Sequence, residues 1–461
     1  MRKFSLISLM LLIVSTSTFA GGLLTNTNQH AAFLRMLSRG ATTEIDGALS
    51  NPAGLAFLPT DGFHMSLSIQ SAFQTRNIDA SFLTYKGFGG MDPNTGKPIL
   101  IPSDKPFTKY YKGKAAAPVI PSIFAAYKSG DWTISGFFAI TGGGGKASFD
   151  DGLPMFDSSA MAGIFQGSLQ KYLKGEGPIV TPDMYDINSA MDGRQYIYSV
   201  QLGLTYKINE WLSAFAGGRM NYFTGGYKGF LTATLKENLG GTPVMSPIGL
   251  DCDQTGWGLT PVIGLDAKLG KLNIGAKYEF KTNLNIENST KENTHPNDVL
   301  AAFKHGVNTP NDIPSMLSVA AAYEFMPVLR ASVEYHFFDD KNAGMANGKQ
   351  KFLTKGTNEY LAGIEWDVTK QLTVSCGGQI TDYGLSNDYQ SDTSFSCDSY
   401  TLGFGAKLKL SERAALNVGY MWTTYDDYTK VSQNYNGTGL SGTNVYSRTN
   451  KVFGLSIDYR F

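Results

Sequence analysis

The end of the chain alternates strictly between apolar and polar residues. Successive side chains of a β-strand point to opposite faces, so alternate residues share a face. One face of the last nine residues carries Phe453, Leu455, Ile457, Tyr459 and Phe461, and the other carries Gly454, Ser456, Asp458 and Arg460. The same alternation recurs at 196–206, 272–281, 329–337 and 400–409. A chain built from such segments is confined to all-β folds.

The connections between these segments are of two kinds. Short turns are predicted near 128–131, 209–211, 270–271, 326–327, 369–371 and 411–412. Long polar segments interleave with them at 86–119, 141–193, 230–256, 288–312, 339–357, 383–398 and 425–448. Six short turns and seven long loops predict fourteen antiparallel strands of about 10–15 residues.

Short turns at one end and long loops at the other are typical of a transmembrane β-barrel of the bacterial outer membrane. A soluble sandwich would also alternate, but it would need short loops at both ends. No run of 18 apolar residues follows residue 20, so helical spans are not expected. Pro121 and Pro261 fall inside predicted strands, and we expect a rim or a bulge at each.

Composition excludes several function classes. The 39 Lys and Arg residues balance 39 Asp and Glu residues, so no basic excess is available for nucleic acid. Five scattered histidines and the absence of CxxC and HExxH motifs argue against a metal site, and no cofactor is expected. No GxSxG motif is present, so enzymatic activity is not expected either. Of the three cysteines, Cys252 and Cys397 leave a bridge between loops open.

The N-terminal sixty residues differ from the rest. Residues 1–20 have the basic start, apolar core and small-x-small end of a signal peptide, which predicts export to the bacterial outer membrane. Residues 21–60 are rich in apolar side chains and predict a short helix over 29–39, with Asn28 as its cap and Gly40 at its end. A fourteen-stranded barrel is too wide to fill itself, so we expect residues 21–60 to plug the barrel of 61–461.

The motifs of this N-terminal segment resemble those of the FadL/TodX family of outer-membrane transporters. They are the leading Gly-Gly-Leu-Leu-Thr-Asn-Thr-Asn, then Phe33-Leu34-Arg35-Met36 and Arg39-Gly40-Ala41, and then Ser50-Asn51-Pro52-Ala53-Gly54-Leu55. The resemblance implies transport of long-chain fatty acids or other hydrophobic compounds. It also implies that residues 21–60 are a hatch, with the hatch motif at Asn51, Pro52, Ala53 and Gly54.

The family has an inward kink in its third strand, beside a gap in the barrel wall. The matching strand here continues into Gly142, Gly143, Gly144 and Gly145, whose backbones tolerate conformations that other residues avoid. The resemblance therefore implies a kink and a lateral opening at these glycines. The alternative is the start of a flexible loop.

Two further groups of residues are candidates for ligand contact. In the longest loop, residues 159–173 carry apolar groups at helical intervals. This spacing suggests an extracellular landing site for ligand. The alternative is that these apolar residues pack on each other and cap the barrel mouth. The predicted contacts of the landing site are Met161, Ile164, Phe165 and Leu169. The predicted apolar contacts of the hatch, which would also line a ligand pocket, are Phe33, Leu34, Leu37, Leu55 and Phe57.

Together these predictions describe a monomeric channel for passive diffusion. The resemblance implies that ligand reaches an apolar pocket, that the hatch rearranges and that ligand leaves sideways into membrane lipid. Lateral exit would also avoid exposing an apolar ligand to a wet lumen. The expected partners are a hydrophobic small molecule (a fatty acid or a hydrocarbon), membrane lipid and the outer-membrane assembly machinery. The competing hypothesis is a general diffusion porin for small polar solutes, against which the apolar content of residues 21–60 argues. The long loops also permit a secondary role as an adhesin or phage receptor.

Overall fold

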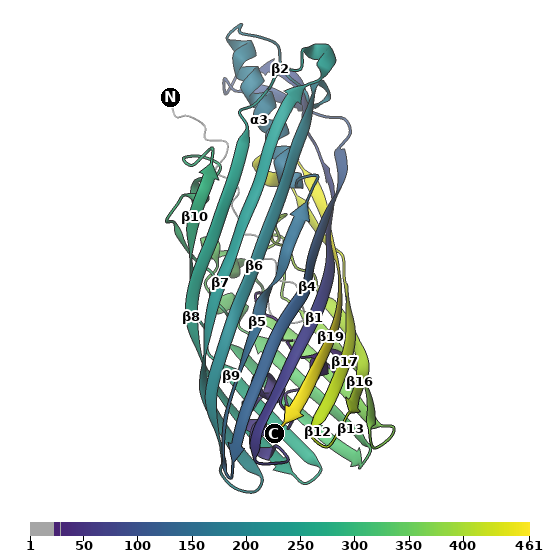
Figure 1. Cartoon of the computed structure of the whole chain (residues 1–461). Coiled ribbons are helices and arrows are strands. Elements are labelled where there is room, and N and C mark those ends of the chain that lie inside the picture. The colour runs from purple at the N-terminus through teal and green to yellow at the C-terminus, as the bar shows by residue number, and fades with distance from the viewer. Residues whose placement is uncertain (1–22, 28) are drawn as a thin grey trace.

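The computed structural model describes residues 23–27 and 29–461 (Figure 1). The predicted signal peptide and the predicted helix cap Asn28 lie outside the described residues. Within the described chain, no helix is both long enough and apolar enough to cross a membrane.

One antiparallel sheet of seventeen segments forms the wall of the molecule. Three of these segments continue neighbouring strands after a break: β10 follows β9, β11 precedes β12, and β18 follows β17. The remaining fourteen are the strands of the wall, which confirms the predicted number. Their bounds are β1 (Gly62–Phe82), β4 (Phe107–Ser129), β5 (Trp132–Phe149), β6 (Tyr185–Lys207), β7 (Leu212–Leu235), β8 (Ile248–Leu269), β9 (Leu272–Glu279), β12 (Met316–Met326), β13 (Leu329–Phe338), β14 (Thr357–Asp367), β15 (Leu372–Asp382), β16 (Ser399–Lys409), β17 (Ala414–Tyr425) and β19 (Gly442–Arg460).

The other elements are short, apart from one long helix. The strand segments are β2 (Tyr85–Met91), β3 (Pro98–Pro102), β10 (Asn285–Asn293), β11 (Asn308–Pro310) and β18 (Tyr428–Ser432). The α-helices are α1 (Ala31–Arg35), α2 (Gly47–Ser50) and α3 (Pro154–Leu173). The 3-10 helices are η1 (Pro52–Phe57), η2 (Pro182–Met184), η3 (Glu237–Leu239), η4 (Ala301–Phe303), η5 (Asp340–Asn342), η6 (Ala346–Phe352) and η7 (Tyr435–Gly437).

The barrel closes where the last strand pairs with the first. β19 runs antiparallel to β1, with Met65 opposite Tyr459 and Ile69 opposite Leu455. The final residue adds to this seam, since the Phe461 amide donates to the Phe63 carbonyl at 2.9 Å. Closure satisfies the backbone groups that an open sheet would leave at its edges.

The strands on one side are longer than predicted. β1 and β4 to β8 have 18–24 residues each. They rise above the opposite wall toward the end of the barrel at which β2 and α3 lie (Figure 1). Parts of the predicted loops at 86–119, 141–193 and 230–256 are therefore strand. These extensions are built from small and polar residues as well as apolar ones, so the sequence pattern did not reveal them.

The wall is apolar outside and polar inside. Leu202, Val333 and Ile380 point outward and are 66%, 60% and 59% exposed. Ser199, Asn221 and Gln379 point inward, are buried and take part in side-chain hydrogen bonds between adjacent strands. This is the reverse of a soluble protein and leaves a broad apolar surface around the barrel.

Each proline inside a strand lies beside a break in pairing rather than at a rim. Pro121 of β4 lies in a stretch that does not pair with β5 in the described chain, near a bulge of β4 in its pairing with β1. Pro261 of β8 lies opposite the point where β9 ends and β10 has not begun. Pro261 accepts the Phe280 amide through its carbonyl at 3.0 Å but has no N–H to donate back, so the β8–β9 ladder ends at this pair. The described cysteines Cys252, Cys376 and Cys397 are all free thiols, so the bridge left open by the sequence is not formed.

Candidate functional site

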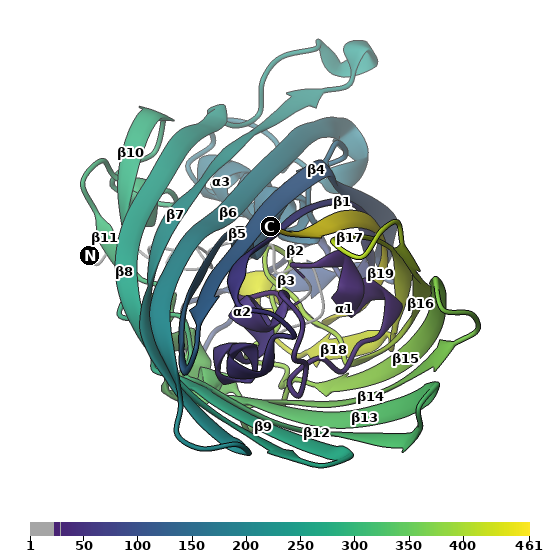
Figure 2. The same cartoon turned by 60° about the horizontal axis from the view of Figure 1, so that its bottom comes forward.

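Residues 23–27 and 29–60, called the hatch below, lie inside the ring of strands. Figure 2 looks into the barrel from its short-turn end and shows α1 and α2 within the lumen. α1 packs against β16, β17 and β19, and η1 packs against β6, β7 and β8. Most described hatch side chains are buried, including Leu34, Leu37 and Leu55 at 0% exposure.

The first hatch helix is shorter than the predicted helix over 29–39. His30 caps it, since its Nδ1 accepts the Ala32 amide at 3.0 Å. The chain turns extended at Met36, and the amides of Arg39 and Gly40 donate to Glu334 of β13 at 2.7 and 2.8 Å. A longer helix would lose both bonds. A Cβ on Gly40 would come within 2.5 Å of Glu334 Oε1, so glycine is required here by close approach to the wall.

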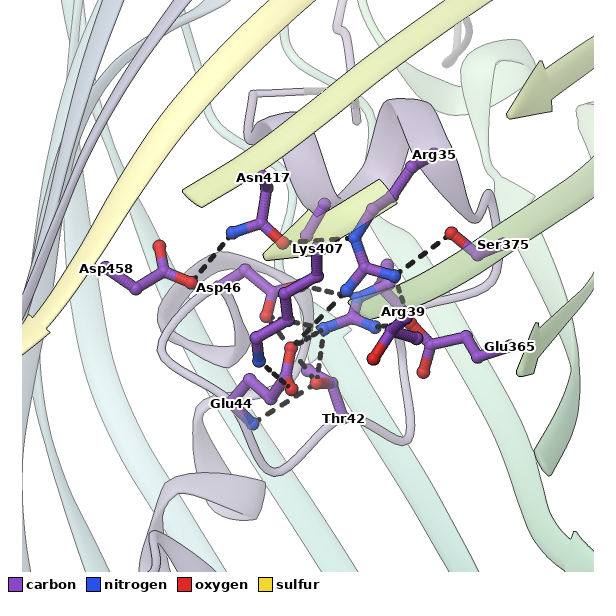
Figure 3. Close-up of polar contacts among 12 residues, drawn as sticks. Arg35, Arg39, Thr42, Glu44, Asp46, Glu365, Ser375, Lys407, Asn417 and Asp458 are labelled. Atoms are coloured by element: carbon purple, nitrogen blue, oxygen red, sulfur yellow. Dashed lines mark hydrogen bonds and ion pairs between the residues drawn. The ribbon is translucent and has the colours of Figure 1, made fainter. Parts of the chain in front are cut away.

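A network of charged side chains joins the hatch to the wall (Figure 3). The Arg35 guanidinium, fully buried, donates through Nη1 to Glu365 of β14, and through Nε to Asn417 Oδ1 of β17 at 3.0 Å. Arg330 of β13 donates to the other Glu365 oxygen at 2.7 Å. One wall carboxylate therefore pairs with a hatch cation and a wall cation together.

The second half of the network lies within the hatch and reaches one wall lysine. Arg39 donates to Asp46 Oδ2 at 2.7 Å and to Glu44 Oε2 at 2.9 Å, while Lys407 of β16 pairs with Glu44. Burial would raise the pKa of the Glu44 carboxyl, but Lys407, Arg39 and Arg35 hold that pKa well below its ordinary value. Glu44 is therefore ionised over the whole neutral range.

The hatch motif is attached to the opposite side of the wall. Asn51 is buried and donates through Nδ2 to the Leu265 carbonyl at 3.0 Å and to Asp266 Oδ2 at 3.2 Å. The Pro52 and Ala53 carbonyls accept hydroxyl donors from β6 and β7 at 2.9 and 2.7 Å. At Gly54, a Cβ would lie 2.3 Å from the Thr42 carbonyl oxygen. The four motif residues thus form one fixed contact with β6, β7 and β8.

The five predicted apolar contacts of the hatch separate into different places. Phe33, Leu34 and Leu37 lie in one apolar cluster with wall residues such as Ile120 and Ile140. Leu55 lies in a second cluster, around Phe124 and Phe137. Phe57 is half-buried, with its ring 5.8 Å from the Lys268 ammonium. Only Phe33 of these five also lines the small cavity above the hatch.

That cavity is mixed in character. It measures about 40 Å³, and its lining includes Phe33, Leu49 and Ile313 beside the charged residues Arg219, Glu279 and Glu334. Arg219 pairs with Glu279, and Lys277 does so at 2.8 Å. A cavity of this size and polarity suits water rather than a ligand in the closed arrangement.

The wall is interrupted beside the Phe33 cluster. The described pairing of β4 with β5 stops at Ala116–Lys146 and resumes at Ile123–Phe138. Between these points, β5 also has two register shifts against β6, and Gly143 and Gly145 have φ of 83° and 86°. The side chains next to this interruption, called the β4–β5 gap below, include Ala117, Ile120, Ile140, Tyr196 and Tyr198.

All four predicted glycines lie on the β5 side of this gap. A Cβ on Gly142 would lie 2.7 Å from the Leu24 carbonyl oxygen, and one on Gly143 would lie 2.1 Å from the Gln195 carbonyl oxygen. Gly145 approaches the Ala116 carbonyl in the same way, at 2.6 Å, and Gly144 lies between them in β5. These contacts explain why the segment needs glycine, which a flexible loop would not.

The beginning of the hatch pairs with β5 at this position. Thr25 forms an antiparallel bridge with Gly142, the Asn26 amide donates to the Thr141 carbonyl at 2.7 Å, and Asn26 Nδ2 donates to the Gly143 carbonyl at 2.9 Å. The hatch therefore touches the β4–β5 gap directly.

A groove of about 420 Å³ opens at the long-loop end of the barrel. Helix α3 forms one side, and residues 245–248, 295–299 and 436–438 contribute the rest. Gly163 and Gly167 face open space, since no atom lies within 4 Å of a Cβ on either. The volume lies in the range that small-molecule sites occupy.

The four predicted landing residues do not form one exposed surface. Ile164 lines the groove. Met161 packs with Ile164 into the cluster that fills the upper barrel, and Phe165 and Leu169 pack against Tyr85 and Leu440. The groove is instead lined mainly by small and polar residues of α3, which hydrophobic spacing alone could not identify.

The sequence reasoning also missed the anchoring residues of the hatch. Arg35 and Arg39 are the two basic residues of a segment rich in apolar side chains, and that contrast was the available signal. Their wall partner Glu365 shows no such signal, because inward-facing charges occur on many of the strands.

Comparison with known proteins establishes the fold. No protein-family model and no curated protein matches the chain. A FadL homologue from Pseudomonas aeruginosa matches in structure with a TM-score of 0.65 at 15% sequence identity, over 96% of this chain and 100% of that protein. The toluene transporter TodX from Pseudomonas putida matches with a TM-score of 0.58 at 12% identity, over 96% and 100% of the two chains. The chain thus shares the fold of these two proteins along nearly its whole length.

Proposed function

We propose that this protein is an outer-membrane channel for hydrophobic small molecules such as fatty acids or hydrocarbons. Ligand enters the groove beside α3, passes into the lumen above the hatch, and leaves through the β4–β5 gap into the membrane. The outward apolar face of the barrel supports a position in a membrane, and the fold shared with a toluene transporter supports the class of ligand.

The observation that carries the proposal is the β4–β5 gap. It lies beside the Phe33 cluster, and its lining is apolar and aromatic. A ligand that moved from this cluster into lipid would exchange one apolar environment for another and keep about 0.8 kcal/mol per CH₂ group. The route needs no chemical step, so a concentration gradient is a sufficient driving force.

A general diffusion porin is disfavoured by the same observations. The hatch fills the lumen at one end, and apolar side chains of the wall and loops form a large cluster at the other. The described residues thus occupy the lumen at both ends, which argues against a wide aqueous pore for polar solutes.

The test is to add bulk at the gap. Ile120 is buried in the unpaired stretch of β4, and Ile123 lies on the same strand where pairing has resumed, pointing outward. We expect Ile120→Trp to lower uptake of labelled toluene or oleate into cells by at least tenfold and Ile123→Trp to leave it unchanged. Heat-modifiable migration of both variants on a gel would show that each barrel is folded. Equal uptake by the two folded variants would refute exit through the gap.

A further inference from the structure

The loop between β15 and β16, residues 383–398, folds into the upper lumen. Its sequence is polar, and a polar loop ordinarily lies on the surface. Yet Gln390 and Cys397 are 0% exposed, and Tyr389 and Phe395 are 2% exposed. Phe395 and Cys397 pack in the apolar cluster of the upper barrel, and Tyr389 packs against Leu23 at the start of the hatch. The loop therefore spans the space between the outer groove and the hatch.

Cations from three separate elements hold the backbone of this loop. Arg76 of β1 donates to the Phe395 carbonyl at 2.9 Å, and its guanidinium lies 4.8 Å from the Phe395 ring. Lys349 of η6 donates to the Ser394 carbonyl at 2.9 Å. Lys430 of β18 donates to the Gln390 carbonyl at 2.6 Å. Charged donors make the stronger class of hydrogen bond, so the loop is fixed at several points.

These cations also repel one another. Burial, followed by the neighbouring Lys430 and Arg76, lowers the pKa of the Lys349 ammonium to about 7. The contacts that hold residues 383–398 in the lumen thus bring like charges together in a buried environment. Such an arrangement balances attraction against repulsion, and a modest perturbation can shift it.

One carboxylate joins the loop to the outer groove. Asp392 accepts the Met155 amide, in the first turn of α3, at 2.8 Å. It also accepts from Asn444 Nδ2 at 2.7 Å and from the Tyr446 hydroxyl at 2.9 Å, both on β19. Helix α3 forms one side of the groove. A ligand that moves α3 therefore acts on the same side chain that keeps the loop in the lumen.

We propose that residues 383–398 are an inner lid, which closes the lumen beneath the outer groove and opens when a ligand in the groove displaces the start of α3 from Asp392. This inference rests on the proposed function, since it assigns the regulation of the same route. Ligand binding opens the lid only to the extent that the groove binds ligand more tightly in the open state.

Cys397 offers a reporter of lid opening inside the lid itself. Its thiol is fully buried, and burial raises its pKa to about 11, so it is protected when the lid is closed. The chain has 3 cysteines, and Cys252→Ser with Cys376→Ser leaves Cys397 as the single thiol. In this background we would measure labelling of the purified full-length barrel by a water-soluble maleimide, alone and with oleate or toluene.

We expect either probe to raise the labelling rate of Cys397 at least tenfold. Asp392→Asn should label fast without a probe and respond little to one. The matched control Asp388→Asn, at an exposed position of the same loop, should behave like the parent. If Asp392→Asn fails the heat-modifiability test, Lys430→Met provides a second variant that removes one donor to the lid and should also label fast.

The inner lid is refuted if both folded variants label at the parent's rate, or if oleate and toluene bind without changing the rate. Binding is measured separately, by titration calorimetry on the same samples. Absence of binding and of uptake for both probes would instead contradict the proposed function. Normal uptake with an unresponsive Cys397 would remove the lid and leave the channel standing.

Discussion

Glu365→Gln is the substitution that most directly tests the charged network between the hatch and the wall. The Glu365 carboxylate pairs with Arg35 and Arg330, and Arg39 Nη1 lies 3.7 Å from it. Glutamine keeps nearly the same shape but removes the negative charge. Arg330 retains Asp367 at 2.9 Å and Arg39 retains Asp46 at 2.7 Å. Arg35 is fully buried and keeps only the longer contact to Glu44, at 3.8 Å, so the loss falls mainly on Arg35.

The expected magnitude follows from this distribution of partners. Removing one partner of a buried ion pair costs about 3–5 kcal/mol. Because each of the three cations keeps another carboxylate within 3.8 Å, we take the lower end, about 3 kcal/mol. Each 1.4 kcal/mol corresponds to a factor of ten, so release of α1 from the wall should become about 100-fold more frequent. The hydrogen-bond ladders of the wall do not involve this carboxylate, so the strands should keep their stability.

Hydrogen-exchange mass spectrometry measures this release directly, because exchange reports local opening. Peptides covering 31–46 should exchange about 100-fold faster in Glu365→Gln, while peptides of β6 and β7 stay unchanged. Glu412→Gln is the control, since Glu412 pairs with Arg460 at 3.7 Å on an exposed turn. Replacing the pair together, as Arg35→Met with Glu365→Met, should restore part of the protection. Parent-like exchange of 31–46 in a folded Glu365→Gln barrel would show that the network does not anchor the hatch.

Three further outcomes are expected. Asn51→Ala removes two hydrogen bonds to β8 and should destabilise the local packing of the hatch by about 1–3 kcal/mol. We expect faster proteolysis of η1 in a folded barrel. Unchanged cleavage would contradict a positioning role for the motif. Because the pKa of Glu44 lies below its ordinary value of 4.5, its contribution to hatch stability is complete above that pH and is lost as pH falls through the lowered pKa. Hatch exchange should therefore accelerate only in strong acid, and Glu44→Gln should abolish that acid step; an acid step of equal size in the variant would exclude Glu44 as its source. Gly163→Leu fills open groove space without a clash and should weaken oleate binding at least tenfold by calorimetry, whereas parent-like affinity would place the entry site elsewhere.

Much of the architecture could be predicted because the physics that imposes it is periodic. An outward face in contact with lipid must be apolar at every second residue, which makes strands such as β13 and β19 visible in the sequence. The six short turns could be predicted for the same reason, since each one interrupts the two-residue alternation of apolar and polar side chains. The burial of most of the described hatch residues followed from the apolar content of this segment and the width of the barrel.

The rest depended on contacts between distant parts of the chain. The helix predicted over 29–39 ends at Arg35 because Glu334, nearly 300 positions away, binds the amides of Arg39 and Gly40. The sequence of the β15–β16 loop resembles that of an ordinary surface loop. Its burial depends on hydrogen-bond partners from distant parts of the chain, which a local sequence pattern does not indicate. The predicted landing residues failed to form one surface for a related reason. Apolar spacing marks the buried face of α3, while the groove uses the other face.

The β4–β5 gap also bears on how the barrel avoids edge-to-edge strand pairing with another molecule. A break in a sheet normally leaves two rows of unsatisfied donors and acceptors, which in hydrocarbon are costly and in water invite pairing with another chain. Here β4 carries Pro118 and Pro121 along the interrupted stretch, so two of the donors do not exist. On β5, Thr25 and Asn26 of the hatch occupy the facing groups. The wall can therefore interrupt the β4–β5 pairing without leaving a row of free donors for another chain to pair with, and ligand leaving by the proposed route would not have to break the described β4–β5 pairs.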